Sequence, residues 1–273
     1  MSLEFTYKYI DDSSELTGIA DIQSLVWGED GVIPIPLMVA TINSGGNAIA
    51  AIEKNSDKIV GFCYGFPGMD RKRKPFIYSH MLAIHPDYRN AGIGKQLKLA
   101  QRQWALDYGY DQIKWTVDPL EIRNGYLNLN KLGGVVNTYL PDYYGTMTDK
   151  INNGIRSDRL LLEWNLDSGR VNQALGIKKK VENFWHTYRS ILHWTGSENA
   201  PIPETSFEIQ DEQGFLLAIP KEIQRIKEIN TELVKEWRII TREIMMSAFK
   251  AGYSLVGVIR PETGLNYYVF EKQ

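Results

Sequence analysis

The sequence is poor in cysteine, because Cys63 is the only one among 273 residues. A single cysteine can form neither a disulfide within the chain nor a cysteine-based metal site. It lies in the apolar run of residues 59–64, which reads as a strand. We therefore expect Cys63 to be a small buried side chain, and we expect no bound metal.

Excess charge and long apolar runs are also absent. The chain has 31 Lys and Arg against 33 Asp and Glu, a formal net charge of −2, so nothing attracts it to nucleic acid or to an anionic membrane. No apolar run approaches the ~20 residues of a membrane span. The first ten residues alternate and carry charge, unlike a signal peptide. We expect a cytoplasmic protein with no nucleic-acid or membrane partner.

The most informative stretch is residues 81–97. An apolar run at its start ends at Pro86, which cannot donate to a sheet ladder. Gly92 and Gly94 follow, and from Ile93 onward apolar residues recur at helical spacing. A glycine turn between a strand and a helix offers unpaired backbone N–H groups and a positive dipole end. That arrangement predicts a site for a phosphate or diphosphate.

Two familiar phosphate loops do not fit this stretch. A P-loop needs Ser or Thr after its lysine, but Gln96 follows Lys95. A dinucleotide fingerprint needs a third glycine where Leu97 stands. The remaining pattern is Arg-x-x-Gly-x-Gly, beginning at Arg89. Taken alone, it leaves open a glycine turn that caps a helix and binds nothing.

The first 168 residues show a regular succession of elements. Apolar periodicity and turn residues predict one strand, two helices, three strands, a helix, a strand, a helix and two strands. The expected strands are residues 3–10, 47–53, 58–66, 76–84, 111–117, 135–140 and 160–166, and the expected helices are residues 13–27, 34–43, 92–108 and 121–132.

Residues 169–273 read as a smaller α+β unit. We expect a helical connector at 171–195, a strand at 215–219, one long helix at 221–250, and a hairpin at 253–272. Three roles are open for this unit: extending the first sheet, shaping an acceptor pocket, or forming a homodimer. The expected fold class is α+β in three layers, with domains at 1–168 and 169–273.

The element order and the Arg-x-x-Gly-x-Gly loop together resemble the GNAT acetyltransferase superfamily, over about residues 3–168. Within it, the chain is similar to a branch of uncharacterised predicted GNAT acyltransferases. The matching positions are Ser79-His80-Met81, Trp115-Thr116, Asp118-Pro119-Leu120, Arg123-Asn124, Asn128, Lys131-Leu132-Gly133, Tyr144-Gly145 and Asp158-Arg159. The resemblance implies a mixed, mostly antiparallel sheet and makes an empty glycine turn a poor explanation.

The activity that the resemblance implies is acetyl-CoA-dependent N-acetylation of a small amine or amino acid. Another donor such as succinyl-CoA, or a non-catalytic CoA-binding module, is the alternative. An exposed strand edge should pair with the amides of the CoA arm, and the glycine loop should hold the diphosphate. The expected cofactor-binding residues are Leu82, Ala83, Ile84, Arg89, Asn90, Ala91, Gly92, Ile93, Gly94, Lys95 and, by family analogy, Asn124.

An alkyl amine acceptor, with a pKa of about 10, must lose a proton before it attacks, so a general base is expected. The candidates are Glu53, His80 and Asp118. His80 titrates in the right range, although a histidine beside a buried strand is often only a packed core residue. Asp118 has a structural alternative as a turn-forming carboxylate before Pro119.

The departing CoA thiolate needs a proton or a hydrogen bond. Many GNAT enzymes use a tyrosine four residues before the glycine that ends the fourth helix, where this chain has Leu129. Tyr126, Tyr139, Tyr143 and Tyr144 lie nearby, and we expect Tyr144 to be the acid. Alternatively the thiolate leaves unaided, since a thiol pKa near 8.5 makes it a fair leaving group.

Overall fold

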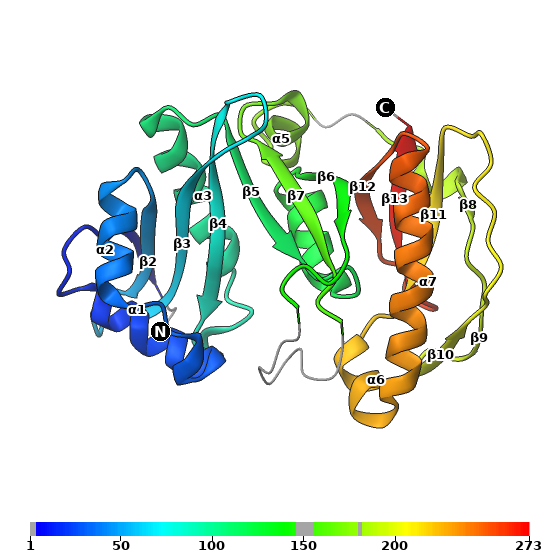
Figure 1. Ribbon diagram of the computed structural model, residues 1–273, viewed down its shortest axis with the longest axis horizontal. Coiled ribbons are helices and arrows are strands. Elements are labelled where there is room, and N and C mark those ends of the chain that lie inside the picture. Colours follow the sequence, from blue (N-terminus) through cyan, green and yellow to red (C-terminus); the bar gives the residue numbers. More distant parts are fainter. Residues whose placement is uncertain (1–3, 146–155, 180–181, 273) are drawn as a thin grey trace. The chain divides into compact units, whose positions relative to one another are not determined.

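The computed structural model describes residues 4–145, 156–179 and 182–272 (Figure 1). They form two compact units, which divide between Trp115 and Thr116. Both units contain helices and strands, and the predicted α+β class is confirmed. The division of the structure does not coincide with the boundary expected after residue 168, which stays a prediction.

The first unit contains the elements predicted from the sequence, to within a few residues. Its sheet has the order β1-β2-β3-β4-β5, in which only the β4–β5 pairing is parallel. The elements are β1 (Phe5–Tyr9), α1 (Leu16–Trp27), α2 (Ile35–Asn43), β2 (Asn47–Glu53), β3 (Ile59–Met69), β4 (Pro75–Ile84), α3 (Ile93–Tyr108) and β5 (Gln112–Val117), the last of which reaches the division between the units.

The core of the first unit lies on both faces of this sheet. Side chains alternate along β2: Ala48 and Ala50 join the cluster beneath α1 and α2, whereas Ile49 and Ala51 join the cluster beneath α3. Covering both faces buries most of β2 and the first part of β3. The edge of β4 therefore stands on a rigid support.

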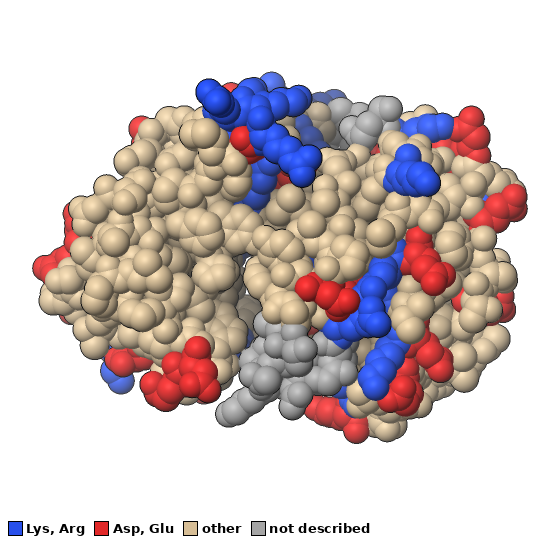
Figure 2. All heavy atoms as spheres, in the orientation of Figure 1, with Lys and Arg blue, Asp and Glu red and all other residues tan. Residues whose placement is uncertain are grey.

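Basic residues gather at the end of the β3–β4 hairpin, at the upper edge of the view in Figure 2. They belong to residues 71–74, which are all exposed. The backbone N–H groups of Lys72 and Lys74 both donate to the Asp70 carboxylate at 2.8 Å. These backbone bonds also lower the pKa of Asp70. The basic run is a turn capped by its own aspartate.

The second unit joins the end of the predicted first domain to the C-terminal residues. Its sheet has the order β7-β6-β12-β13-β11-β8, and Leu255 of β12 pairs with Val136 of β6. The elements are α4 (Ile122–Gly125), a π-helix (Tyr126–Lys131), β6 (Val135–Leu140), β7 (Arg159–Asn165), α5 (Gly169–Ala174), β8 (Arg189–Ser190), β9 (Trp194–Ser197), β10 (Ala200–Pro203), β11 (Gly214–Ile219), α6 (Ile223–Ile229), α7 (Thr231–Lys250), β12 (Tyr253–Ile259) and β13 (Asn266–Lys272).

Two sequence predictions for this unit are wrong. The connector at 171–195 is not mainly helical: α5 ends at Ala174, Gly176 takes a positive φ of 77°, and short strands follow. The predicted single helix at 221–250 is broken at Asn230, whose backbone is extended. Its side chain accepts a hydrogen bond from Leu233 N at 3.1 Å, so it caps a new helix, α7.

Candidate functional site

The first feature of the site is a free strand edge on β4. The parallel pairing of β4 with β5 consists of Ile77 with Ile113 and Tyr78 with Lys114. Beyond Tyr78, Ser79 and residues 81–84 of β4 have register partners on β3, and none of residues 79–84 has one on β5 among the described residues. The backbone groups on that side are therefore available to an extended ligand.

The second feature is a β-bulge at His80. Tyr64 of β3 pairs with Met81 while its neighbour Gly65 pairs with Ser79, which leaves His80 as the extra residue on β4. The bulge falls where β4 parts from β5. It interrupts the ladder next to the free edge, and bulges of this kind commonly re-aim a side chain beside an active site.

His80 is an exposed residue, and one side of its imidazole packs against aromatic neighbours. Its ring centroid lies 5.7 Å from that of Phe66 and 6.4 Å from that of Tyr78. Burial by its surroundings lowers the pKa of His80 below its usual 6.5. At neutral pH the imidazole is therefore mostly neutral and able to accept a proton.

The third feature is the open N-terminus of α3. Gly92 begins the helix with a positive φ of 79°, and no side chain caps it. The backbone N–H of Gln96 donates to the Gly92 carbonyl at 3.3 Å. The N–H groups of Ile93, Gly94 and Lys95 come earlier in the first turn, where an α-helix supplies no acceptor of its own. No acidic residue lies in the first turn. The helix dipole is thus uncompensated and suited to an anion.

Gly94 joins the loop to the strand edge. A Cβ at this position would stand 3.2 Å from Ile84 Cδ1 and 3.7 Å from Leu82 Cδ2. The glycine lets the first turn of α3 pack closely on the end of β4. The first unit therefore brings together ten predicted cofactor-binding residues: Leu82, Ala83, Ile84, Arg89, Asn90, Ala91, Gly92, Ile93, Gly94 and Lys95.

Glu53, at the end of β2, has two hydrogen-bonding partners. Its carboxylate accepts from Tyr88 Oη at 3.0 Å and from Ser56 Oγ at 2.5 Å, and the residue is 9% exposed. The bond to Glu53 raises the pKa of Tyr88. Because Tyr88 directly precedes Arg89, Glu53 anchors the base of the glycine loop.

Lys98 is a functional candidate that sequence reasoning missed. This lysine of α3 is 4% exposed, and its ammonium donates to Ser79 Oγ at 2.6 Å and lies 3.8 Å from the centre of the Trp115 ring. No carboxylate pairs with it among the described residues. Burial lowers the pKa of Lys98 to about 8. A partly neutral amine thus sits directly behind the bulge.

The lysine belongs to a buried polar network. Gln101 Oε1 accepts from Ser79 Oγ at 2.8 Å, and Gln101 Nε2 donates to Asn47 Oδ1 at 2.9 Å. The other amide atom of Asn47, Nδ2, has no hydrogen-bond partner among the described residues. The network links α3 to β2 and β4. Its signal in the sequence is the pair Lys98 and Gln101, two polar residues inside the apolar stripe of α3.

Asp118 lies in the second unit, where two arginines hold it. Arg238 of α7 bonds both carboxylate oxygens, at 2.9 and 2.7 Å, and Arg159 lies 3.7 Å away. Asp118 Oδ1 also accepts from Leu120 N at 2.8 Å, as the turn before Pro119 requires. The carboxylate therefore fastens α7 to the start of this unit.

A second aspartate of the branch-like pattern has the same role. Asp158 is fully buried, and Arg242, one turn after Arg238, bonds both of its oxygens at 2.6 and 2.8 Å. Tyr139 Oη donates to it at 2.6 Å. Burial and this bond raise the pKa of Tyr139 far above its usual value, which makes it a poor proton donor. Sequence reasoning found the aspartates and Arg159 but not Arg238 and Arg242.

The remaining predicted residues are also in the second unit. Tyr144 is 41% exposed, and its hydroxyl lies 2.9 Å from Thr116 Oγ1. Asn124 is exposed on α4, and Leu129, which stands where the family tyrosine was expected, is 2% exposed. Residues 146–155 fall outside the described residues.

Within the described ranges, no three His, Cys, Asp or Glu side chains are grouped so as to hold a metal ion. In the same part of the chain, no helix is long and apolar enough to cross a membrane.

Comparison with known proteins adds a family assignment. No curated protein matches the sequence. Among solved structures, a putative acetyltransferase of Acinetobacter baylyi is 17% identical, with coverage of 62% of this chain and 96% of its own and a TM-score of 0.49. A putative acetyltransferase of Salmonella typhimurium, solved with acetyl-CoA, is 16% identical, with coverages of 60% and 95% and a TM-score of 0.48.

The Escherichia coli ribosomal-protein-S18-alanine N-acetyltransferase is 14% identical, with coverages of 61% and 96% and a TM-score of 0.48. Similarity at this level does not extend to the substrate. The sequence profile of the Acetyltransferase (GNAT) family matches residues 20–124, which include β2 to β5, the bulge and the glycine loop. Residues 20–124 are therefore a domain of the GNAT acetyltransferase family.

Proposed function

We propose that the protein transfers an acetyl group from acetyl-CoA to the amine of a small molecule or amino acid. The observation that carries the proposal is the free edge of β4 running into the uncapped N-terminus of α3. One surface thus offers a ladder for an amide-bearing arm and, at its end, a cradle for a diphosphate. CoA carries both groups in that order.

The diphosphate binds to the backbone N–H groups of residues 90–95. Gly92 is exposed, and a Cβ there would meet no atom within 4 Å, so an anion can approach the backbone closely. Arg89 and Lys95 supply positive charge. The arm then runs back along β4, where Leu82, Ala83 and Ile84 present their backbone groups, and Asn124 is proposed to contact the arm as well.

The thioester lies at the bulge. Backbone N–H groups freed from a ladder are suitable donors for the oxygen that gains charge when an amine attacks a thioester. In the reaction the amine nitrogen forms a bond to the acyl carbon, the carbon–sulfur bond breaks, and the amine loses a proton. The products are an amide and CoA.

We assign the general base to His80. It lies at the bulge, and its lowered pKa keeps it neutral near pH 7. Glu53 is a weaker candidate because it is bonded to Tyr88 and Ser56 at the diphosphate end of the edge. Asp118 is a weaker candidate because two arginines hold it. Tyr144, with an exposed hydroxyl, stays the proposed donor of a proton to the thiolate.

The test is release of the CoA thiol during incubation with acetyl-CoA or succinyl-CoA and a panel of amines. The protein itself adds little background, because Cys63 is buried, as predicted, and burial raises the pKa of its thiol to about 12. We expect acetyl-CoA to support turnover with at least one amine. Tight CoA binding without turnover on any amine would contradict an enzymatic role.

The two ends of α3 provide a matched pair of variants. Gly92 and Gly109 flank the same helix, both have positive φ, and a Cβ added to either would meet no atom within 4 Å. We expect Gly92→Trp to abolish CoA binding, measured by calorimetry, because the indole fills the diphosphate cradle. Gly109→Trp carries the same backbone strain and should bind CoA as the parent does. Equal affinities would rule out the proposed loop.

A non-catalytic CoA-binding module is the second candidate. It is favoured by Leu129, a buried aliphatic residue where the resemblance leads one to expect the acid. The thiol-release assay separates the two functions, since a sensor binds CoA in the calorimeter and releases no thiol.

A further inference from the structure

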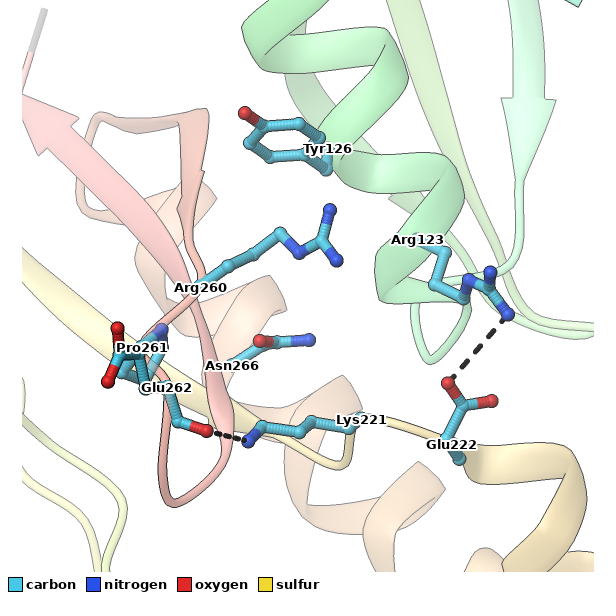
Figure 3. Close-up of a pocket in the computed structure, with 8 residues that line it drawn as sticks. All are labelled: Arg123, Tyr126, Lys221, Glu222, Arg260, Pro261, Glu262 and Asn266. Atoms are coloured by element: carbon cyan, nitrogen blue, oxygen red, sulfur yellow. Dashed lines mark hydrogen bonds and ion pairs between the residues drawn. The ribbon is translucent and has the colours of Figure 1, made fainter. Parts of the chain in front are cut away.

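A pocket of about 490 Å³ opens within the second unit, and none of its lining residues is one assigned to acyl transfer (Figure 3). This volume is typical of small-molecule sites, which span about 300–1,000 Å³. Its walls come from α4 and the π-helix, from the approach to α6, and from the β12–β13 hairpin. The lining residues are Arg123, Tyr126, Lys221, Glu222, Arg260, Pro261, Glu262 and Asn266.

Arg260 is the cation of this pocket that lacks an acidic partner. Its guanidinium carbon lies 4.9 Å from the centre of the Tyr126 ring, and no described carboxylate forms an ion pair with it. The Glu262 side chain points away from the guanidinium (Figure 3). Contact with an aromatic face steadies a guanidinium while leaving its N–H edges free to bind an anion.

Asn266 is the second observation, and it is independent of charge. The residue is only 6% exposed, yet its side-chain amide forms no hydrogen bond with the described residues. The amide points into the pocket, on the same side as the Arg260 guanidinium (Figure 3). Buried amides nearly always have partners, so an open one on a pocket wall marks the place of a ligand.

The other two cations already have partners but add positive potential. Arg123 lies 3.7 Å from Glu222, in a pair whose side chains are both more than half exposed and therefore weakly coupled. Lys221 donates to the Glu262 carbonyl at 3.1 Å and lies 3.3 Å from Glu198.

We propose that this pocket binds a small organic anion, with a carboxylate or a phosphate seated between Arg260 and Asn266. Arginine can donate two parallel hydrogen bonds to either group, and the Asn266 amide can donate a third. This site is distinct from the CoA loop, and its binding function does not depend on acyl transfer.

The test is calorimetric titration of the full chain with succinate and, separately, with inorganic phosphate, at matched ionic strength in sodium chloride. We expect saturable binding of at least one of the two anions. The anion that binds shows whether the pocket recognises a carboxylate or a phosphate. Arg260→Gln should weaken that binding about tenfold to a hundredfold, as for a lost charge-assisted bond. Asn266→Leu should weaken it about tenfold.

Arg225→Gln, an exposed arginine on α6 of the same unit, is the matched control and should bind as the parent does. Because Asn266 is buried, a melting curve must show that the Asn266→Leu variant is folded. Arg260 is exposed, so the Arg260→Gln variant tests the proposal even if the Asn266 variant does not fold. Binding no stronger than that of chloride, or unaltered by Arg260→Gln, would overturn the proposal. Displacement of the bound probe by CoA would also overturn it, since the pocket would then belong to the cofactor.

Discussion

Lys98 of the first unit and two arginines of α7 in the second are held in opposite ways. In the first, Lys98 is buried against Trp115 and neutral polar groups, and burial lowers its pKa to about 8. In the second, Arg238 and Arg242 each hold an aspartate through two bonds, and these pairs raise the pKa values of both arginines against the effect of burial. One unit contains an uncompensated charge, and the other contains closed ion pairs.

The contrast distinguishes groups that are candidates for catalysis from groups that stabilise the fold. A titratable group without an ionic partner can change its protonation near neutral pH, and such groups are candidates for function. His80 and Lys98 of the first unit meet that description. The aspartates of the second unit that resemble the family pattern are bonded to arginines of α7, and they fasten this helix to the start of the unit at Asp118 and to the start of β7 at Asp158.

The largest expected effect is on catalysis, from His80→Gln. Loss of a general base should lower kcat about 10²- to 10⁴-fold. The pKa of His80 lies below 6.5, so the parent rate should fall as pH drops through that lower range, and the variant should lack this limb. His193→Gln, an exposed histidine, is the control. An unchanged pH–rate profile for thiol release would remove His80 from the mechanism.

Next in size is the loss of stability from Arg242→Met. The change leaves the Asp158 carboxylate, which is 0% exposed, without its cation, and breaking a buried pair in this way costs about 3–5 kcal/mol. Urea unfolding gives the value, and exposed Arg225→Met should cost far less.

A second substitution tests the cause. Adding Asp158→Asn to Arg242→Met removes the stranded charge and should restore part of the lost free energy of unfolding. No recovery would mean that lost packing by the arginine stem, rather than an unpaired carboxylate, explains the effect.

The sequence alone was sufficient to predict features that depend on residues close together in the chain. Strand alternation located β1 to β7, and Arg89, Gly92 and Gly94 lie in one short loop. It was insufficient where distant segments meet. The Lys98 network joins Asn47, Ser79 and Gln101 from three elements, and no spacing rule links them.

Local chemistry also misled in the C-terminal residues. The helical pattern of residues 221–250 continues through Asn230, but its side chain stabilises a helix start better than a helix interior. In the connector, where a helix was expected, Trp185 and Tyr188 both donate to Glu271 of β13, at 3.0 and 2.9 Å. Tertiary bonds outweigh weak helical propensity there.

A smaller effect should come from Lys98→Met. The folded pKa of about 8 lies below the unfolded value of 10.5, so the unfolded chain binds more protons between them and stability rises with pH there. The full rise is roughly 3 kcal/mol, of which about 1 kcal/mol falls between pH 8 and 9. The range from about pH 8 to 9 is the useful one. Above it, the Cys63 thiol with its raised pKa makes the free energy of unfolding fall as pH rises, which opposes the effect of Lys98.

Denaturant unfolding at pH 7, 8 and 9 measures this slope. The parent should gain stability over the window, and Lys98→Met should not. A parent curve as flat as that of the variant would show that Lys98 has an ordinary pKa, and the contrast between the units would disappear.

The smallest effect should come from Lys235→Met. This variant tests whether burial or contact distance determines how much an ion pair of the second unit contributes to stability. Lys235 lies on α7 with Arg242, and its 2.7 Å contact with Glu232 is almost as short as the 2.6 Å contact of Arg242 with Asp158. The side chains of this pair are 46% and 76% exposed, so solvent screens the attraction and the expected loss is about 0.5 kcal/mol or less. Urea unfolding beside Arg242→Met compares two bonds of nearly equal length on one helix. Equal losses would mean that contact distance, rather than burial, sets the value of these pairs.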